Sequence, residues 1–408
     1  MPTLAIVVPE YRTAVARGGG LAAVADFVAT TFSGAHVPHE DRWDIRIVSP
    51  RMHHRAPEHA SVLRPATMRR GPVARRRQGT TLEIWDVGTT MPEIEANRYR
   101  PRRALTDLVN ECDAAIVIAG TPAIGNVMRD VRVPWILKVA TVVEEERAAR
   151  LATTWGARGA LLRLATRSTR RLDHRALTLP EAIVTMNDSM SALIRDRTDR
   201  PVHLLATGVD VDAFQPAQRR DAGGPILMVS RLNDPRKDVA TLVRAYEIAR
   251  RVHGVRNELV LAGRHALPTE DHDLIGELGL AEHVRVVESP SDTRLAELLR
   301  SASVFALASR EEGLGVVFLE AMASGLPIVT TATRGARYAV PANVGRLVPL
   351  DTDTVPEFAA ALEDVVQDRS GSDRRGEVAR AHVVAEFATE VVERRWRSLL
   401  DDVVGAAR

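Results

Sequence analysis

Short runs of β-branched and other apolar residues recur along the chain, and longer stretches with helical spacing separate them. The runs are continuously apolar rather than alternating, which is typical of strands that are buried on both faces. Strands that alternate with helices in this way predict parallel βαβ units, so we expect an α/β protein of two doubly wound, Rossmann-like domains. The expected strands are residues 4–8, 44–49, 114–119, 134–140, 182–186, 225–230, 258–263, 284–288, 303–309 and 327–331.

A turn-rich stretch, ATGVDVDAFQPAQRRDAGGP at residues 206–225, separates the two sets of expected strands. We interpret it as the linker and predict a first domain over residues 1–207 and a second domain over residues 208–385. Toward the end of the chain, apolar residues at helical spacing over roughly 383–403 predict a long helix with one face to bury. The polar stretch RSGSDRRG, residues 369–376, is expected to be a loop before that helix.

The chain has 408 residues, of which 45% are hydrophobic and 26% charged, and these values fit a globular protein of two domains. No apolar run approaches the ~20 residues that a transmembrane helix needs. The first residues also lack the basic segment of a signal peptide. The single cysteine, Cys112, excludes an internal disulfide framework and a cysteine-rich metal site. Together these features predict a cytoplasmic protein without a transmembrane segment.

Charge is distributed unevenly, because residues 1–200 are net basic and the remainder is net acidic, which favours two domains with different partners. The basic excess gathers in loop-like segments, which fit either solvated loops or attraction to an anionic acceptor or a membrane surface. Peripheral membrane contact therefore stays open. With 4% aromatic residues and no zinc-finger or helix-turn-helix pattern, the chain is not expected to bind nucleic acid. The arginines concerned are Arg69, Arg70, Arg75, Arg76, Arg77, Arg98, Arg100, Arg102 and Arg103.

The stretch REEGLGVVFLEAMASG, residues 310–325, follows the expected strand SVFALAS and contains the candidate chemistry. VVFLEAMAS has the character of a helix, Gly325 stands where a C-terminal cap belongs, and Pro327 stops any continuation. The unit is therefore strand, loop, helix and strand, with the loop at the carboxyl end of the strand. Ligands of open parallel sheets bind at that edge.

Two glutamates and two glycines in this stretch suit a long ligand that has phosphate in its middle. A helix N-terminus attracts anions, and Gly313 and Gly315 let the backbone approach the ligand closely. Glu312 precedes the helix and Glu320 lies inside it, so their carboxylates could be on the order of 10 Å apart. Carboxylates accept hydrogen bonds from sugar hydroxyls. A nucleoside diphosphate sugar has hydroxyls at both ends and phosphates between them. The plainer alternative is that both glutamates are surface charges.

A diphosphate also needs cations, and the segment MVSRLNDPRKD supplies them directly after the first strand of the second half. Arg231 offers a bidentate fork and Lys237 a point charge to phosphate oxygens. Arg236 is a competing candidate because it neighbours Lys237. Lys237 and Lys138 are the two lysines among 55 basic residues. Because lysine is so rare in this chain, both are candidates for a specific role.

At these residues the chain resembles the retaining glycosyltransferases of the GT-B fold, family 4, also called glycosyl transferases group 1. The resemblance rests on SRLNDPRKDVATLVRAYE, REEGLGVVFLEAMASGLPIV and ATGVDVDAFQP, and it covers most of residues 181–400. It implies two Rossmann-like domains facing across a cleft. The first would be the acceptor side and the second would bind the nucleotide sugar. Residues 386–408, with Trp396, would return to brace the first domain. It also implies that no cofactor and no metal is required.

The resemblance further implies a role for each candidate residue. Glu320 would bind ribose hydroxyls, Glu312 would bind the transferred hexose, and Arg231 and Lys237 would neutralise the diphosphate leaving group. Donors placed where charge develops stabilise the transition state. The expected catalytic residues are Glu312, Arg231 and Lys237. The expected donor-binding residues are Gly19, Gly20, Ser230, Arg231, Lys237, Gly263, Glu312, Gly313, Leu314, Gly315, Val316 and Glu320.

The first half supports fewer assignments. By resemblance, the glycine pair Gly19 and Gly20 would face the donor phosphates, but many members of the family carry a histidine near Ala140 that is absent here. Lys138 and Glu144 are the candidates for the acceptor side. An acidic helix start, which the helix dipole favours, is the alternative explanation for Glu144.

Two other functions stay open from the sequence. A dinucleotide-dependent oxidoreductase would need residues 18–23 to form a tight glycine turn, with Asp41 on the ribose. A pseudo-transferase would bind a nucleotide sugar without turning it over. For the transferase, the family's habits favour a UDP-sugar and leave a GDP-sugar possible. The acceptor would be a hydroxyl of a small molecule, a lipid or a glycan.

Overall fold

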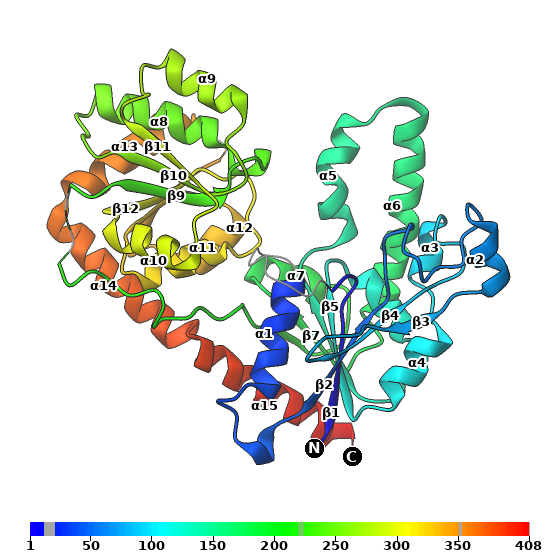
Figure 1. Cartoon of the computed structure of the whole chain (residues 1–408). Coiled ribbons are helices and arrows are strands. Elements are labelled where there is room, and N and C mark those ends of the chain that lie inside the picture. Colours follow the sequence, from blue (N-terminus) through cyan, green and yellow to red (C-terminus); the bar gives the residue numbers. More distant parts are fainter. Residues whose placement is uncertain (12–20, 220, 222, 351–352, 408) are drawn as a thin grey trace. The chain divides into compact units, whose positions relative to one another are not determined.

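The structure is a computed structural model that describes residues 1–11, 21–219, 221, 223–350 and 353–407. These residues form two compact units, shown in Figure 1. The first unit is Met1–Leu205 together with Glu393–Arg408, and the second is Ala206–Val392. The sequence-based boundaries lie after residues 207 and 385. No helix in the described part of the chain is both long enough and apolar enough to cross a membrane.

The first unit is built on an eight-stranded sheet in the order β3-β4-β2-β1-β5-β6-β7-β8. All neighbouring strands are parallel except β3 and β4. β5 is buried along its whole length, which explains its continuously apolar sequence. The strands are β1 Thr3–Val7, β2 Asp44–Ser49, β3 Ala74–Arg76, β4 Glu83–Val87, β5 Ala114–Ala119, β6 Trp135–Val139, β7 Ala182–Thr185 and β8 Val202–Leu204.

The helices of this unit are tied to one another partly by one buried carboxylate, Asp173. It accepts hydrogen bonds from the amides of Ala123 at 2.7 Å and Val143 at 3.0 Å, and burial raises its pKa to about 6. The helices are α1 Leu21–Ser33, α2 Pro65–Arg70, α3 Glu95–Arg98, α4 Arg103–Asn110, α5 Val143–Thr153, α6 Gly156–Ala176 and α7 Asp188–Arg195, with the 3-10 turns η1 His39–Asp41 and η2 Pro122–Met128.

The second unit is built on a six-stranded, entirely parallel sheet in the order β11-β10-β9-β12-β13-β14. The chain runs from β9 outward to β11 and then returns to β12 on the other side of β9. The boundary between β9 and β12 is therefore a topological switch point, where ligands of doubly wound sheets bind. The strands are β9 Ile226–Arg231, β10 Leu259–Arg264, β11 Val284–Glu288, β12 Val304–Leu307, β13 Ile328–Thr331 and β14 Gly345–Val348.

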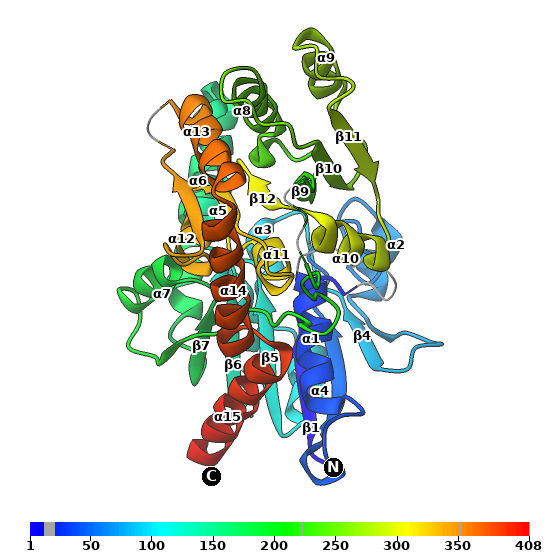
Figure 2. The ribbon, with the colours of Figure 1, turned by 90° about the vertical axis from the view of Figure 1, so that its left-hand side faces the viewer.

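Helices cover both faces of this sheet, as Figures 1 and 2 show, with α8 and α13 on one face and α10 and α11 on the other. The two units thus confirm the expected pair of doubly wound, Rossmann-like domains. The helices are α8 Val239–Arg251, α9 Thr269–Glu277, α10 Asp292–Ser301, α11 Val316–Ala323, α12 Arg334–Ala339, α13 Thr354–Gln367, α14 Arg369–Glu386 and α15 Thr389–Ala407, with the 3-10 turn η3 Pro235–Lys237.

The structure corrects the expected loop at residues 369–376, which is the first half of α14. The Asp368 side chain caps this helix by accepting a hydrogen bond from the Gly371 amide at 3.0 Å. The helix predicted over roughly 383–403 is also interrupted, because α14 ends before α15 begins. At the break, Val209 donates to the Phe387 carbonyl at 2.8 Å and accepts from the Thr389 amide at 3.0 Å.

Candidate functional site

The predicted donor residues gather at the carboxyl ends of β9 and β12, the two strands at the switch point of the second sheet. β9 pairs with β12 directly, with Ile226 opposite Val304. Arg231 ends β9, Lys237 ends the following turn η3, and Glu312 lies in the loop after β12. Chain order and sheet order together therefore bring residues that are distant in sequence to one edge.

Lys237 and Glu312 form a mostly buried ion pair. The Lys237 ammonium donates to Glu312 Oε1 at 2.5 Å, and the two side chains are 12% and 7% exposed. The Ser309 hydroxyl donates to the same oxygen at 2.8 Å. Within the described residues no donor is assigned to Oε2 of Glu312. One carboxylate oxygen is thus engaged by the protein, and the other remains able to accept a hydrogen bond from a ligand hydroxyl.

The loop that carries Glu312 is fixed from several sides. Arg310 donates from its backbone amide to the Arg236 carbonyl at 2.8 Å and from its side chain to Asp238 Oδ2 at 2.6 Å. The Gly335 amide donates to the Glu312 carbonyl at 3.0 Å. These bonds join the loop after β12 to the turn after β9 and to α12. The carboxylate is therefore positioned before any ligand arrives.

Arg231 and Arg236, the two arginines beside Lys237, both contact Asp234. The Arg231 side chain is 54% exposed and contacts Asp234 at 2.6 Å. Arg236 is held to Asp234 by two side-chain hydrogen bonds, at 3.1 Å and 2.8 Å. The hydrogen bond from Arg236 lowers the pKa of Asp234 to about 2, and the charge of Arg231 contributes as well. Asp234 therefore holds both guanidinium groups in place, and the Arg236 side chain, at 51%, is about as exposed as that of Arg231.

The helix α11 has the start and the end that its sequence predicts. Gly315 is its N-cap, with φ +74°, a left-handed backbone that favours glycine. At its other end, Gly325 donates to Met322 and Leu326 to Ala321, which is the paired pattern of a Schellman cap. Gly313 and Val316 are exposed, whereas the side chain of Leu314 is buried. Leu314 is therefore available to a ligand only through its backbone.

Glu320 lies inside α11 with a carboxylate that no hydrogen bond or ion pair holds within the described residues. Burial raises the pKa of Glu320 to about 7, and the charge of Asp292 adds to the effect. A carboxyl group that is half ionised near neutral pH and lacks a protein partner is suited to accept hydrogen bonds from a ligand.

Ser230 and Gly263 lie opposite each other at the ends of β9 and β10. A Cβ atom at Gly263 would lie 1.6 Å from the Ser230 carbonyl oxygen, so only glycine permits this approach of the two strands. The Ser230 hydroxyl is buried and has no hydrogen-bond partner among the described residues. An unpaired buried hydroxyl is costly and indicates a missing partner at this edge.

The sequence analysis missed a further feature of the same edge. Asp238, His265 and Ser289 follow β9, β10 and β11 and have φ values of 46°, 67° and 48°. Left-handed backbones at residues other than glycine store strain and cluster at binding sites. His265 and Ser289 stand immediately after apolar strand runs, but nothing in their own sequence marks the conformation.

The acceptor-side candidates have different surroundings. Lys138 is 3% exposed; its ammonium donates to the Leu205 carbonyl at 3.2 Å and lies 5.9 Å from the centre of the Trp396 ring. Burial lowers its pKa to about 7. These contacts favour a structural role for Lys138. Glu144 pairs with Arg170 at 2.9 Å and Arg197 at 3.4 Å.

Two other predictions concern the first unit. Gly18, Gly19 and Gly20 lie outside the described residues. Asp41, the ribose ligand that an oxidoreductase would need, is exposed in η1. Among the described residues no group of three or more His, Cys, Asp and Glu side chains could hold a metal ion.

Residues 212–382, which carry this site, match the family model described as glycosyl transferases group 1. The chain contains a group 1 glycosyl transferase domain. The match covers both the β9–α8 segment and the loop and helix after β12. The candidate site therefore lies within the matched residues, at the switch point of the second sheet.

Curated relatives agree with the family model. A mannosyltransferase of Mycolicibacterium hassiacum, named MMP alpha-(1->4)-mannosyltransferase, is 34% identical over 53% of this chain and 53% of its own. A GDP-mannose-dependent alpha-(1-6)-phosphatidylinositol monomannoside mannosyltransferase of Mycobacterium tuberculosis is 32% identical over 48% of this chain and 52% of its own. The chain spans about half the length of the curated relatives it matches.

Solved structures extend the likeness to the whole chain at the level of fold. Sucrose-phosphate synthase from Thermosynechococcus elongatus superposes with a TM-score of 0.70 over 99% of this chain and 100% of the other, at 17% identity. HepE of Anabaena, solved with UDP-glucose, superposes with a TM-score of 0.66 over 98% of this chain and 99% of the other, at 13% identity. The fold around the group 1 domain is therefore that of the GT-B glycosyltransferases.

Proposed function

We propose that the chain is a retaining glycosyltransferase that moves a hexose from a nucleoside diphosphate sugar to a hydroxyl group of a small-molecule, lipid or glycan acceptor. The observation that carries the proposal is the Lys237–Glu312 pair, joined at 2.5 Å at the switch point of the second sheet. Arg231, the start of α11 and the unpaired Ser230 hydroxyl lie at the same edge of that sheet.

The chemistry assigns a task to each group. Breaking the bond between the sugar and the diphosphate builds negative charge on the leaving group, which Lys237 and Arg231 are placed to stabilise. Glu312 holds the Lys237 ammonium through Oε1 and offers Oε2 to a hexose hydroxyl. Glu320 accepts the ribose hydroxyls. The leaving phosphate oxygen can take the proton of the acceptor hydroxyl, so no protein nucleophile is needed and no cofactor is proposed.

The identity of the base is part of the proposal, with uridine first and guanosine second. Uridine is the expectation from the resemblance to family 4. Guanosine is supported by a relative whose name includes GDP-mannose, although that likeness covers about half of each chain. Both therefore belong in the first experiment.

The test is a thermal-shift panel of UDP- and GDP-sugars, followed by assays of nucleoside diphosphate release with hydroxyl acceptors. We expect one nucleotide sugar to raise the melting temperature of the parent protein, and a much smaller rise in the Arg231→Ala variant. If NAD raised it instead, the protein would be an oxidoreductase. Binding without release from any acceptor or water would indicate a pseudo-transferase.

Peripheral contact with a membrane surface is also proposed, and α6 is the element that supports it. Trp155, directly before this helix, is 80% exposed, and Leu161 and Leu164 on the helix are 68% and 64% exposed. Exposed arginines share the helix with these apolar side chains, a combination that favours anionic lipid surfaces. Co-sedimentation of the protein with anionic and with neutral vesicles would test this contact.

A further inference from the structure

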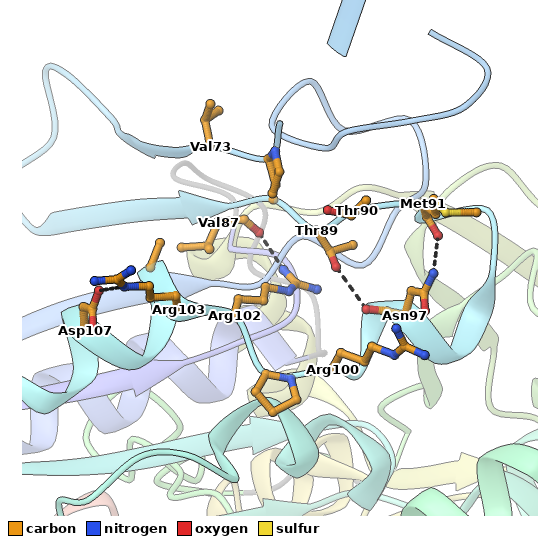
Figure 3. Close-up of a pocket in the computed structure, with 14 residues that line it drawn as sticks. Val73, Val87, Thr89, Thr90, Met91, Asn97, Arg100, Arg102, Arg103 and Asp107 are labelled. Carbon is orange, nitrogen blue, oxygen red and sulfur yellow. Dashed lines mark hydrogen bonds and ion pairs between the residues drawn. The ribbon is translucent and has the colours of Figure 1, made fainter. Parts of the chain in front are cut away.

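The first unit contains a pocket of about 590 Å³ that the proposed donor site does not explain. Figure 3 shows the residues that line it, which come from the segment just before β3, from the end of β4 and the segment after it, and from the start of α4. It borders Val87, the last residue of β4, and therefore lies at the carboxyl edge of the first sheet, where open sheets bind ligands. Its volume falls in the range of small-molecule sites.

Arg102, one of the lining residues, is a buried cation. Its side chain donates to three backbone carbonyls: that of Pro50, that of Val87 at 2.6 Å and that of Arg98 at 2.7 Å. The residue is 6% exposed, and its Nε has no hydrogen-bond partner among the described residues. Burial lowers the pKa of Arg102 to about 9. A buried charged donor without a partner is costly to the folded state.

The carboxylates near this pocket lie next to other arginines. Asp86 pairs with Arg77 at 2.7 Å, and Arg51 lies 3.8 Å from both Asp86 and Glu58. No ion pair holds Arg102 within the described part of the chain. Carbonyl oxygens supply hydrogen bonds to its guanidinium but no countercharge. The protein thus leaves one buried positive charge unbalanced on the wall of a pocket.

Two more arginines flank Arg102 on the same wall, as Figure 3 shows. Arg103 is 95% exposed on its side chain and contacts Asp107 at 3.7 Å, an exposed pair of the kind that contributes little. Arg100 is exposed, and no hydrogen bond or ion pair of its side chain is found among the described residues. Asp107 is the one acidic side chain among those that line the pocket, and its charge offsets only one of the three arginines.

We propose that this pocket binds the phosphate group of a phosphorylated small molecule of sugar or polyol size. The guanidinium groups of Arg100 and Arg103 hold the phosphate oxygens, and the phosphate supplies the countercharge that the buried Arg102 lacks. The residues that line this pocket all belong to the first unit, and the proposal does not rest on the proposed transfer reaction.

The test is calorimetric titration of the whole chain with glycerol 3-phosphate, with glycerol as the uncharged comparison. We expect glycerol 3-phosphate to bind and glycerol not to bind. The Arg100→Gln/Arg103→Gln variant should lose at least about tenfold in affinity, which corresponds to about 1.4 kcal/mol. The matched control is Arg75→Gln/Arg76→Gln, which removes the same charge from exposed residues of β3 that do not line the pocket.

All of these variants keep the donor site, so any phosphate bound by Lys237 and Arg231 contributes equally to each titration. Equal affinity in the two double variants, or no binding to the parent protein, would overturn the proposal. If the Arg100→Gln/Arg103→Gln variant has a much lower melting temperature than the parent, the single variant Arg103→Gln replaces it, because that side chain is almost fully exposed. A several-fold loss of affinity for glycerol 3-phosphate is then expected. Binding of the nucleotide sugar should be unchanged in the pocket variants, so failure of this proposal and failure of the transferase proposal are distinguishable.

Discussion

At the scale of single residues, the proposed catalytic groups also stabilise the fold. Lys237 and Glu312 are mostly buried and neutralise each other, and removing one partner leaves the other as an uncompensated buried charge. A loss of activity in a single variant could therefore come from the loss of a catalytic group or from the loss of stability. Arg231 is free of this problem because it is largely exposed.

The two causes can be separated with paired substitutions. Lys237→Met should destabilise the protein by about 3–5 kcal/mol. Lys237→Met/Glu312→Gln should recover most of that loss, because the unpaired charge is gone. Turnover should fall by at least about a hundredfold in both variants and in Arg231→Ala. Urea unfolding and nucleoside diphosphate release measure the two effects. Near-normal rates in Arg231→Ala and in the double variant would contradict the phosphate assignment.

Glu320 gives the site a dependence on pH. Its pKa is raised to about 7, so the carboxylate is ionised above that pH and protonated below it. If the ionised form accepts the ribose hydroxyls, donor affinity should rise about tenfold between roughly pH 6 and pH 8. Glu320→Gln should bind more weakly at high pH and show a flat profile. Titrations of the parent and the variant with the same nucleotide sugar over this range provide the measurement.

At the scale of elements, the sequence predicts the strands that have apolar runs and misses those that lack them. Every expected run became a strand, including β11, which is only partly buried; in the strands covered on both faces, burial requires a continuous apolar sequence. The missed strands β3, β4, β8 and β14 contain exposed or partly exposed residues and lack such runs. Their pairing depends on neighbours that are distant in sequence. The glutamate segment was predictable because strand, loop, helix and cap all follow one another locally.

The start of α14 shows how a cap can decide a structure that residue propensities do not favour. RSGSDRRG reads as a loop, yet Asp368 caps it and Ser372 donates to the Val365 carbonyl at 2.5 Å. Asp368→Ala should cost about 1 kcal/mol in the free energy of unfolding. Asp353→Ala is the matched control, since Asp353 precedes α13 without a side-chain capping bond. Urea unfolding of both variants gives the comparison, and equal losses would contradict the capping role.

At the scale of the whole molecule, contacts that join distant segments were the hardest to foresee. Lys138 was a candidate for an acceptor site because lysine is rare in this chain. Its burial against Leu205 and Trp396 depends on the return of the last helix to the first sheet, which only the resemblance suggested. The burial of Arg102 likewise follows from three carbonyls that converge from the ends of β2, β4 and α3. The sequence next to Lys138 and next to Arg102 does not predict the burial of either side chain.

Lys138 predicts a measurable dependence of stability on pH. Its pKa is about 7 in the folded state and near its ordinary value of about 10.4 when unfolded, so unfolding takes up a proton between these values. Stability should therefore rise with pH over this window, by about 1.4 kcal/mol per pH unit for one proton. In Lys138→Met the contribution of this group should vanish. Urea unfolding at several values between about pH 7 and pH 9 measures the slope, and an identical slope in the variant would contradict the assignment.

The first unit is discontinuous, because Glu393–Arg408 completes a body that otherwise ends at Leu205. Trp396, among the largest fully buried side chains, belongs to that final segment. During synthesis, the amino-terminal half is translated before Glu393–Arg408. Its hydrophobic surface therefore stays exposed until the second unit has been translated. A truncation within the second unit would therefore leave the first unit incomplete as well.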